Sequence, residues 1–430
     1  MLDDAPIQLN ADFQYALDAL EKGANMFITG KAGTGKSTLL QLFRDTTRKK
    51  VVVLAPTGIA ALNVKGQTIH SFFGFPPKPI TKADIKQKRY RGLYQKLDVM
   101  IIDEISMVRA DMLDNIDHFL RINRDMLDEP FGGVQVVFFG DLFQLPPVVK
   151  KEEAEYFRTN YQSPYFFSAD VMQEIELERL ELSFVYRQDN RAFIRLLDNI
   201  RTNSLDYDDL EALNERYYKE LSDYEMEGHF ITLSARNNEV DRINHQQLSK
   251  LQGTEVTFTG RADGNFTERL FPTDIILKLR VGAQVMFVKN DPKRRFVNGT
   301  IGTVTQLTQD QIKVTITDEE GNPRGINVKK MDWELIRHKI DDDGNIGSDT
   351  IGTFVQYPLR LAWAITIHKS QGKTFDKVII DLGKGSFAHG QTYVALSRCT
   401  SLQGVVLKQR IRPRDIMLDP RIVEYNESQY

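Results

Sequence analysis

A glycine-rich segment at residues 30–38 (GKAGTGKST) contains the residue types that hold a nucleotide phosphate. It follows an apolar run at 26–28 and precedes a segment at 39–43 with helical apolar spacing. Its glycines permit backbone angles that turn N–H groups toward phosphate oxygens, and the following helix adds partial positive charge. Lys36 would reach the β- and γ-phosphates, and the Ser37 hydroxyl would bind Mg²⁺. Strand, glycine loop and helix in this order predict a nucleoside triphosphate site rather than a chance glycine turn.

A second buried strand, predicted at 99–102, ends in two adjacent carboxylates. Asp103 at the strand tip can bind Mg²⁺, directly or through water, opposite Ser37. Glu104 is then placed to orient and polarise an attacking water. The pair is informative because it follows a hydrophobic strand downstream of a phosphate loop.

Two glutamines could report on a bound nucleotide. Gln144 lies in a proline-bearing loop after the buried strand predicted at 133–141, where it could sense the γ-phosphate. A proline-stiffened turn with an exposed Gln144 is the alternative. Gln14 lies on a helix that Asn10 or Asp12 can cap, and its amide could read both edges of an adenine. Taken alone, Gln14 is better explained as a surface residue.

A segment at 66–75 combines small hydroxyls, an imidazole and aromatics beyond the strand predicted at 51–55. These residue types at the carboxyl end of a strand suit backbone contacts and base stacking along a single nucleic-acid strand. Core aromatics around a buried histidine would give the same pattern. The following residues, 76–96, predict a small insertion that contacts a nucleic-acid backbone or forms a solvated face. Its basic residues are Lys78, Lys82, Lys86, Lys88, Arg89, Arg91 and Lys96.

The composition is that of an ordinary globular protein, with 430 residues, 41% hydrophobic and 27% charged. This length predicts two to four domains at about 100–200 residues each. The net charge of −3 means that a nucleic-acid footprint must be a local groove of positive charge. The single cysteine, Cys399, excludes an intramolecular disulfide and a cysteine-rich zinc site, and fits a reducing compartment.

The sequence contains no window near the roughly 18 apolar residues of a membrane span, and residues 1–10 lack a signal pattern. We therefore expect a cytoplasmic protein without a targeting or membrane segment, associated with the nucleoid if it is bacterial.

The chain reads as two α/β halves with an inserted β region. A second α/β domain begins near residue 186 and contains a predicted strand within 230–237. Residues 281–335 form short alternating strands between turn residues such as Asn298 and Gly299, which predicts a small inserted β-barrel. The second domain resumes at 361–374.

Taken together, these segments resemble the superfamily-one DNA helicases and, within them, the Pif-one family (superfamily-one B, RecD-like branch). The resemblance covers about residues 9–400, and its motifs occur in the family order. They are GKAGTGKST at 30–38, APTGIAA at 55–61, TIHSFF at 68–73, IIDEISM at 101–107, FFGDLFQLPPV at 138–148, YRQ at 186–188, TIHKSQGKTFD at 366–376 and YVALSR at 393–398. The segment at 106–121 looks like the signature of the Pif-one branch.

The resemblance implies an α/β fold of two RecA-like P-loop NTPase domains with parallel sheets, a small wedge insertion and an SH3-like β-barrel insertion. ATP would lie in the cleft between the RecA-like domains. The implied boundaries are domain 1A at 1–185 with wedge 1B at 66–96, domain 2A at 186–280 and 355–430, and domain 2B at 281–354.

The resemblance also implies residue roles. The implied catalytic residues are Lys36, Glu104, Gln144, Arg187 and Arg398, of which the two arginines would face the γ-phosphate from the second domain. The implied ATP contacts are Gln14, Gly33, Thr34, Gly35, Lys36, Ser37, Thr38 and Gly372, and the implied Mg²⁺ ligands are Ser37 and Asp103. The implied DNA contacts are Thr57, Gly58, His70, Phe72, Thr366, His368 and Lys369.

The implied activity is ATP-dependent 5′-to-3′ movement on single-stranded DNA, with unwinding of forked duplexes, RNA–DNA hybrids and G-quadruplexes. The family resemblance also implies roles in DNA repair and telomere maintenance. The implied cofactors are ATP and Mg²⁺, the implied partners are single-stranded and forked or structured DNA, and we expect a monomer in the absence of DNA.

Three alternatives stay open. A nucleotide switch that does not translocate would share the phosphate loop and the carboxylate pair, but would not need TIHSFF or TIHKSQGKTFD. A module that melts or holds DNA could use hydrolysis only for release. An RNA helicase would share the same ATPase residues.

Overall fold

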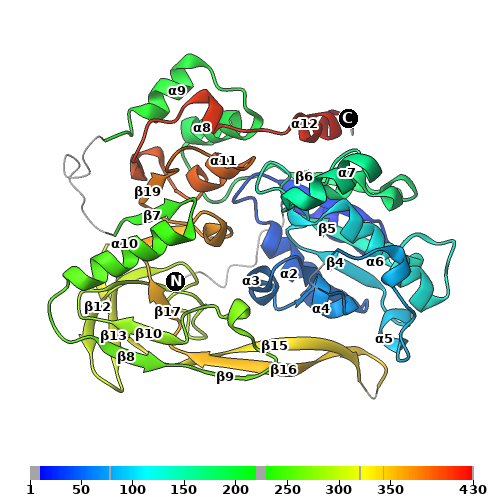
Figure 1. Ribbon diagram of the computed structural model, residues 1–430, viewed down its shortest axis with the longest axis horizontal. Helices are drawn as coiled ribbons and strands as arrows, with labels where there is room; N and C mark the ends of the chain where they lie inside the picture. The colour runs from blue at the N-terminus through cyan, green and yellow to red at the C-terminus, as the bar shows by residue number, and fades with distance from the viewer. Residues whose placement is uncertain (1–9, 77–78, 219–228, 319–320, 342, 429–430) are drawn as a thin grey trace.

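The computed structural model describes residues 10–76, 79–218, 229–318, 321–341 and 343–428 (Figure 1). The first domain is built on a six-stranded parallel sheet of order β3-β2-β4-β5-β1-β6. Its strands are β1 (Met26–Gly30), β2 (Val51–Ala55), β3 (Gln67–Thr68), β4 (Val99–Ile102), β5 (Gln135–Phe139) and β6 (Glu178–Leu182). The apolar runs predicted as buried strands form its centre, as parallel strands covered on both faces require.

Helices cover both faces of this sheet. They are α1 (Ala11–Glu21), α2 (Lys36–Thr46), α3 (Gly58–Asn63), α4 (Ile69–Phe73), α5 (Gly92–Gln95), α6 (Ala110–Arg124) and α7 (Ala154–Asn160). Side chains alternate along β1, so Met26 and Ile28 pack with α1 and α2, while Phe27 packs with α4 and α6. The Asn10 side chain accepts a hydrogen bond from the Phe13 N–H and caps α1, as predicted.

The second domain contains a four-stranded parallel sheet of order β18-β7-β19-β20. Its strands are β7 (Ile231–Ser234), β18 (Ala364–Thr366), β19 (Val378–Asp381) and β20 (Val405–Leu407), and its helices are α8 (Arg191–Thr202), α9 (Tyr207–Asn214), α10 (Asn237–Lys250) and α11 (Gln391–Leu396). The predicted α/β fold with two parallel sheets is confirmed. Within the described ranges, no helix combines the length and apolar character that crossing a bilayer requires.

An antiparallel region is inserted between β7 and β18 of the second domain (Figure 1). Its strands are β8 (Val256–Thr259), β9 (Arg261–Gly264), β10 (Ile276–Leu279), β11 (Gln284–Phe287), β12 (Ile301–Leu307), β13 (Ile312–Thr317), β14 (Pro323–Val328), β15 (Met331–Ile340), β16 (Ile346–Gln356) and β17 (Leu359–Leu361). The antiparallel strands therefore begin before the predicted boundary at residue 281 and end after 354. Three of them, β8 to β10, are short and separated by turns, so their alternation was hard to see in the sequence.

The hairpin β15–β16 extends from this region to the first domain and passes along α3, α4 and α5 (Figure 1). The His338 backbone N–H donates to the Gln67 side-chain oxygen at 3.1 Å. Near the hairpin tip, the Lys50 Nζ donates to the Gly344 carbonyl at 3.0 Å. The hairpin thus joins the inserted region to the sheet of the first domain. Of the basic insertion predicted at 76–96, Lys78 lies outside the described residues.

The last helix, α12 (Pro420–Glu427), lies beside the first domain although it follows the last strand of the second (Figure 1). Ile422 belongs to the hydrophobic core of the first domain. The Tyr165 hydroxyl donates to Asp419 at 3.1 Å, and the rings of Phe167 and Tyr425 stack at 4.2 Å. Two segments, 183–185 and 408–419, therefore connect the domains covalently.

Candidate functional site

A cleft of about 770 Å³ lies between the two parallel-sheet domains. The first domain contributes the phosphate loop, Glu104 and Gln144, and the second contributes Arg187 and residues near α11. The lining residues are Phe13, Ala32, Gly33, Thr34, Gly35, Lys36, Ser37, Thr38, Glu104, Gln144, Tyr186, Arg187, Gly372, Thr374 and Arg398. The structure therefore brings all five predicted catalytic residues to one cleft.

The phosphate loop has the backbone that its glycines predicted. Gly30, Gly33 and Gly35 have φ of 147°, 86° and 86°, a region that L-amino acids with a Cβ rarely adopt. Gly35 is the N-cap of α2, so the loop leads directly into the positive end of that helix. This geometry suits a phosphate group bound by backbone N–H donors.

Lys36 lies within the loop, where its Nζ donates to the carbonyl oxygens of Gly30 at 2.6 Å and Lys31 at 2.9 Å. Burial lowers the pKa of Lys36 to about 8, because the loss of solvation outweighs the attraction of Asp141 and Glu104. A phosphate oxygen would supply a closer negative charge and keep the ammonium protonated. The residue therefore fits the predicted contact to a triphosphate.

The carboxylate pair follows β4 in a constrained backbone. Glu104 has φ 53° and ψ 45°, a left-handed conformation that costs about 1–3 kcal/mol for a non-glycine residue and is concentrated at functional sites. Burial raises the pKa of both carboxyls, and burial together with repulsion by Glu104 raises the pKa of Asp103 to about 7. A nearby cation would relieve that repulsion. Glu104 lines the cleft, whereas Asp103 lies beside it.

Ser37 and Asp103 fit a Mg²⁺ site in which the protein supplies only some of the metal ligands. Ser37 presents an exposed hydroxyl at the start of α2, and Asp103 supplies a carboxylate at the neighbouring strand tip. Among the described residues, no cluster of three or more His, Cys, Asp or Glu side chains could hold a metal ion. Mg²⁺ is commonly bound through one or two protein oxygens plus substrate phosphates and water, so this sparse ligand set suits it.

Two guanidinium groups face the cleft from the second domain. Arg398 is 1% exposed and donates to the Val394 carbonyl and the Ser397 hydroxyl, both at 2.9 Å. Arg187 donates to the Thr374 hydroxyl at 2.8 Å and to the Ser397 carbonyl at 3.1 Å. Burial, together with repulsion by Arg187, lowers the pKa of Arg398 to about 9. A bound triphosphate would neutralise this pair of cations.

Gln144 lies in the loop 140–147, which we call the glutamine loop. Its side chain lines the cleft and is 7% exposed, so the alternative of an exposed turn is wrong. The Gln144 Nε2 donates to Asp141 at 3.4 Å, and the Gln144 backbone N–H donates to the Asp141 carbonyl at 3.0 Å. Asp141, two residues after the end of β5, therefore holds the Gln144 amide at the cleft.

Two aromatic side chains that can stack on a nucleotide base line the cleft. Phe13 and Tyr186 both line it, and the Phe13 ring packs 3.0 Å from the position of a Cβ on Gly35. Gln14, the predicted adenine reader, is exposed outside the cleft and donates to Asp18 at 2.9 Å. The sequence motifs assign no nucleotide contact to Phe13 or to Tyr186. The place of Tyr186 before Arg187 in YRQ was the available signal.

The predicted DNA contacts of the first domain lie outside this cleft, along α3 and α4. Thr57 is exposed and caps α3 by accepting from the Ala60 N–H at 3.3 Å. Gly58 lies directly under Leu270 of the inserted region, with no space for a side chain. His70 is half-buried on α4, and burial lowers its pKa.

Phe72 occupies a different environment. It is 5% exposed and makes edge-to-face contacts with Phe73, Tyr94 and His338. The structure gives this side chain a packing role between the first-domain core and the β15–β16 hairpin.

The predicted DNA contacts of the second domain follow β18. His368 and Lys369 are exposed, while Thr366 is buried and accepts from the Lys369 N–H at 3.2 Å. Thr366 and Lys369 line a separate cavity of about 210 Å³ between the second domain and the inserted region. The two predicted DNA-binding groups thus lie on different domains and do not share a cavity.

Comparisons with known proteins agree on one family. The family model described as PIF1-like helicase matches residues 8–209, and the model for the 2B domain of DNA helicase Pif1 matches residues 269–307. The ATP-dependent DNA helicase Pif1 of Bdellovibrio bacteriovorus is 34% identical over 97% of this chain and 92% of its own length.

Solved structures of Pif1 from Bacteroides sp. are similar to this chain along nearly its whole length. The complex with ADP-AlF4 has a TM-score of 0.90 at 39% identity, covering 98% of this chain and 96% of the other. Bacteroides Pif1 bound to single-stranded DNA has a TM-score of 0.70 at the same identity, with 98% and 96% coverage. The described arrangement therefore resembles the ADP-AlF4 complex more closely than the complex with single-stranded DNA.

Proposed function

Because the chain belongs to the PIF1-like helicase family, we propose that this ATP-dependent DNA helicase moves 5′ to 3′ on single-stranded DNA and unwinds forked duplexes. One observation carries the proposal: a single cleft brings Lys36 of the first domain to the same site as Arg187 and Arg398 of the second. A nucleotide held from both sides can couple hydrolysis to movement of one domain against the other. RNA–DNA hybrids and G-quadruplexes are further substrates that the family resemblance supports.

Each residue of the cleft has a proposed role in hydrolysis. Lys36 and the two arginines hold the phosphate oxygens and stabilise the charge that develops on them. Glu104 orients the attacking water and accepts its proton. Ser37 and Asp103 hold Mg²⁺, which supplies positive charge to the phosphate oxygens when bound. The buried Gln144 amide lies where it can distinguish the presence of the γ-phosphate from its loss.

Domain closure converts these contacts into movement. A nucleotide that contacts Lys36 on one side and the two arginines on the other stabilises the closed form of the cleft. Hydrolysis removes the contacts to the γ-phosphate, and the closed form is then less stable. The DNA-binding groups lie on both domains, so closing the cleft changes the distance between them. Alternating binding of the DNA backbone by the two domains would produce steps along the strand that do not depend on base sequence.

The proposal is tested by steady-state ATPase assays of the wild type and Lys36→Ala, with and without single-stranded DNA. Unwinding of forks with a 5′ or a 3′ tail is measured in parallel. We expect DNA to stimulate the wild type at least about tenfold, the variant to lose this activity, and unwinding to need the 5′ tail. Stronger stimulation by single-stranded RNA than by single-stranded DNA would instead favour an RNA helicase.

Other outcomes identify the alternatives. An ATPase that is indifferent to DNA would overturn the helicase proposal and leave a nucleotide switch. Glu104→Gln should retain DNA binding and lose unwinding, whereas a module that only holds or melts DNA would keep unwinding. Sedimentation of the DNA-free protein at several concentrations tests the proposed monomer, and a concentration-dependent increase in mass would contradict it.

A further inference from the structure

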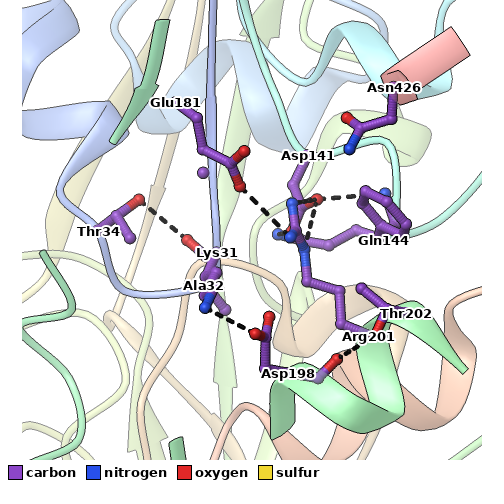
Figure 2. A network of polar contacts seen from close by, with 12 residues as sticks. Lys31, Ala32, Thr34, Asp141, Gln144, Glu181, Asp198, Arg201, Thr202 and Asn426 are labelled. Atoms are coloured by element: carbon purple, nitrogen blue, oxygen red, sulfur yellow. Dashed lines mark hydrogen bonds and ion pairs between the residues drawn. The ribbon is translucent and has the colours of Figure 1, made fainter. Parts of the chain in front are cut away.

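A buried ion pair connects the two domains behind the nucleotide cleft (Figure 2). Arg201 lies near the end of α8, and its side chain is 5% exposed. Its Nη2 and Nε donate to Asp141 Oδ1 at 3.1 and 3.3 Å, and its Nη1 lies 3.4 Å from Glu181. The guanidinium also lies 4.2 Å above the centre of the Phe143 ring.

The partners of Arg201 belong to the first domain, whereas Arg201 itself belongs to the second. Asp141 and Phe143 follow β5, and Glu181 lies in β6. The apolar face of α8, which includes Phe193 and Ile200, packs in the second-domain core. Every contact named for the Arg201 guanidinium therefore crosses from one domain to the other.

The carboxylate that binds Arg201 also organises the glutamine loop. Asp141 Oδ1 accepts from the Phe143 N–H at 3.2 Å, and Asp141 Oδ2 accepts from the Gln144 amide at 3.4 Å. The Asp141 side chain is fully buried. Since a buried carboxylate needs its donors, a shift of Arg201 would require Asp141, and with it the glutamine loop, to readjust.

The helix that carries Arg201 is suited to transmit domain position. Arg187, which lines the cleft, precedes α8, and Arg201 lies near its other end. The 12 residues of α8 span about 18 Å as one rigid element, capped by Asn190. A second ion pair, between Lys31 and Asp198 at 3.0 Å, joins the middle of α8 to the phosphate loop (Figure 2). One helix thus touches both loops that hold the phosphates.

We propose that Arg201 is a positioning residue that ties Gln144 to the second domain through Asp141, so that the glutamine is aligned for hydrolysis only when the domains are correctly arranged. This inference rests on the proposed role of Gln144 at the γ-phosphate. Arg201 itself does not line the cleft. It therefore acts on the rate of hydrolysis and leaves nucleotide binding to the residues of the cleft.

The first test compares Arg201→Gln with Arg195→Gln. Arg195 lies on the same helix, is 73% exposed and pairs with Asp209 at 3.3 Å, so it is a matched surface control. In the presence of single-stranded DNA, we expect Arg201→Gln to lower kcat at least about tenfold with less than a threefold change in the KM for ATP. Arg195→Gln should stay within about twofold of the wild type in both. An Arg201→Gln variant with unchanged kcat would overturn the proposal.

The second test asks whether Arg201 acts through Gln144. The double variant Arg201→Gln/Gln144→Ala should be no slower than Gln144→Ala alone, because the second change removes the group that Arg201 positions. A double variant slower by the product of the two single effects would show that Arg201 acts elsewhere, and would overturn the proposal. Melting temperatures of all variants separate loss of positioning from loss of folding.

Arg201→Lys covers the case in which Arg201→Gln does not fold. It keeps the charge but lacks the planar fork and the stacking on Phe143, so we expect kcat between those of the wild type and Gln144→Ala. Full wild-type kcat in Arg201→Lys would contradict the positioning role.

Failure of the helicase proposal is distinguishable from failure of this inference. If DNA does not stimulate the wild type, the proposed function fails. The same variants are then compared by their kcat for ATP hydrolysis without DNA. That comparison still shows whether the effects of substituting Arg201 and Gln144 are non-additive.

Discussion

Gly390 lies where the second domain touches the glutamine loop, immediately before α11. A Cβ at this position would overlap the carbonyl oxygens of Phe143 and Gln144. Its φ of 70° adds a backbone reason for glycine. Gly390 and Arg201 both belong to the second domain, and both contact the glutamine loop. The loop is therefore packed against the second domain at two points.

We predict that Gly390→Ala lowers the rate of ATP hydrolysis by about tenfold or more, because the added methyl group pushes the glutamine loop away from the cleft. Gly383→Ala is the matched control. Gly383 has a similar φ of 61°, but a Cβ there would meet no atom within 4 Å. Both variants carry the same backbone strain of about 1 kcal/mol, so comparable kcat losses in both would contradict the steric explanation.

At the residue scale, sequence reasoning found the groups whose function depends on local spacing. Lys36 and Ser37 follow from the glycine loop, and Asp103 and Glu104 follow from their place after a buried strand. Arg201 could not be found in this way. Its partner Asp141 is 60 residues away on the other domain, and an arginine near the end of a helix has an ordinary explanation in the helix dipole.

The β15–β16 hairpin is the element that links the inserted region to the predicted DNA-binding surface of the first domain. It packs along α3 and α4, where Thr57 and His70 lie. Phe72, one of the predicted DNA contacts, packs against His338 of the hairpin. We therefore expect the docked hairpin to compete with DNA for this surface.

This competition predicts that Lys50→Ala binds single-stranded DNA about two- to fivefold more tightly than the wild type. The substitution removes the hydrogen bond to the Gly344 carbonyl near the hairpin tip, worth about 0.5–1 kcal/mol at a partly exposed site, and so favours the undocked form. Fluorescence anisotropy of a labelled oligonucleotide at fixed salt measures the effect.

Lys22→Ala is the control, because it removes the same charge from the end of α1. Losing a positive charge should by itself weaken DNA binding. Weaker binding by Lys50→Ala than by Lys22→Ala would show that Lys50 contacts DNA and does not act through the hairpin.

Element boundaries were predictable where one face of an element is apolar and continuous. The strands at 51–55 and 99–102 have the predicted positions because each is buried on both faces. The inserted region was less predictable, since strands such as β9 expose most of their residues and pair with β16, about 90 residues later. Strand pairing between segments so far apart in the sequence cannot be predicted from the apolar and polar alternation of either segment alone.

At the scale of the whole molecule, α12 fixes the relation between the domains on the side away from the inserted region. The helix follows the second domain but is anchored on the first by Ile422, by the ring of Tyr425 and by Asp419. The Asp419 side chain also caps the helix by accepting from the Arg421 N–H. The anchor therefore limits how far the cleft can open.

We predict that Asp419→Ala releases α12, because it removes both the cap, worth about 1 kcal/mol, and the bond from Tyr165. Amide hydrogen exchange in 420–427 should become at least about fivefold faster, and the exposed Glu424→Ala on the same helix should change it little. Unchanged exchange in Asp419→Ala would show that apolar packing alone anchors the helix.

The same anchor should weaken in acid. Burial by itself would raise the pKa of the Asp419 carboxyl. Hydrogen bonds from Arg421 and Tyr165 outweigh burial and hold this pKa below its usual value. A depressed carboxyl pKa stabilises the docked helix above the unfolded-state pKa, and that stability is lost as the pH falls through the folded-state pKa. The protection factors of residues 420–427, which correct for the intrinsic pH dependence of amide exchange, should therefore fall in the wild type at acidic pH and depend less on pH in Asp419→Ala.

The position of Ile422 has a consequence for how the protein is made. The core cluster that contains Ile422 is otherwise built from buried residues up to Val171, about 250 positions earlier in the chain. During synthesis the first domain can form its sheet early, but its hydrophobic surface for α12 stays uncovered until the second domain has been translated. A nascent chain therefore exposes this apolar surface until residue 422 has been translated.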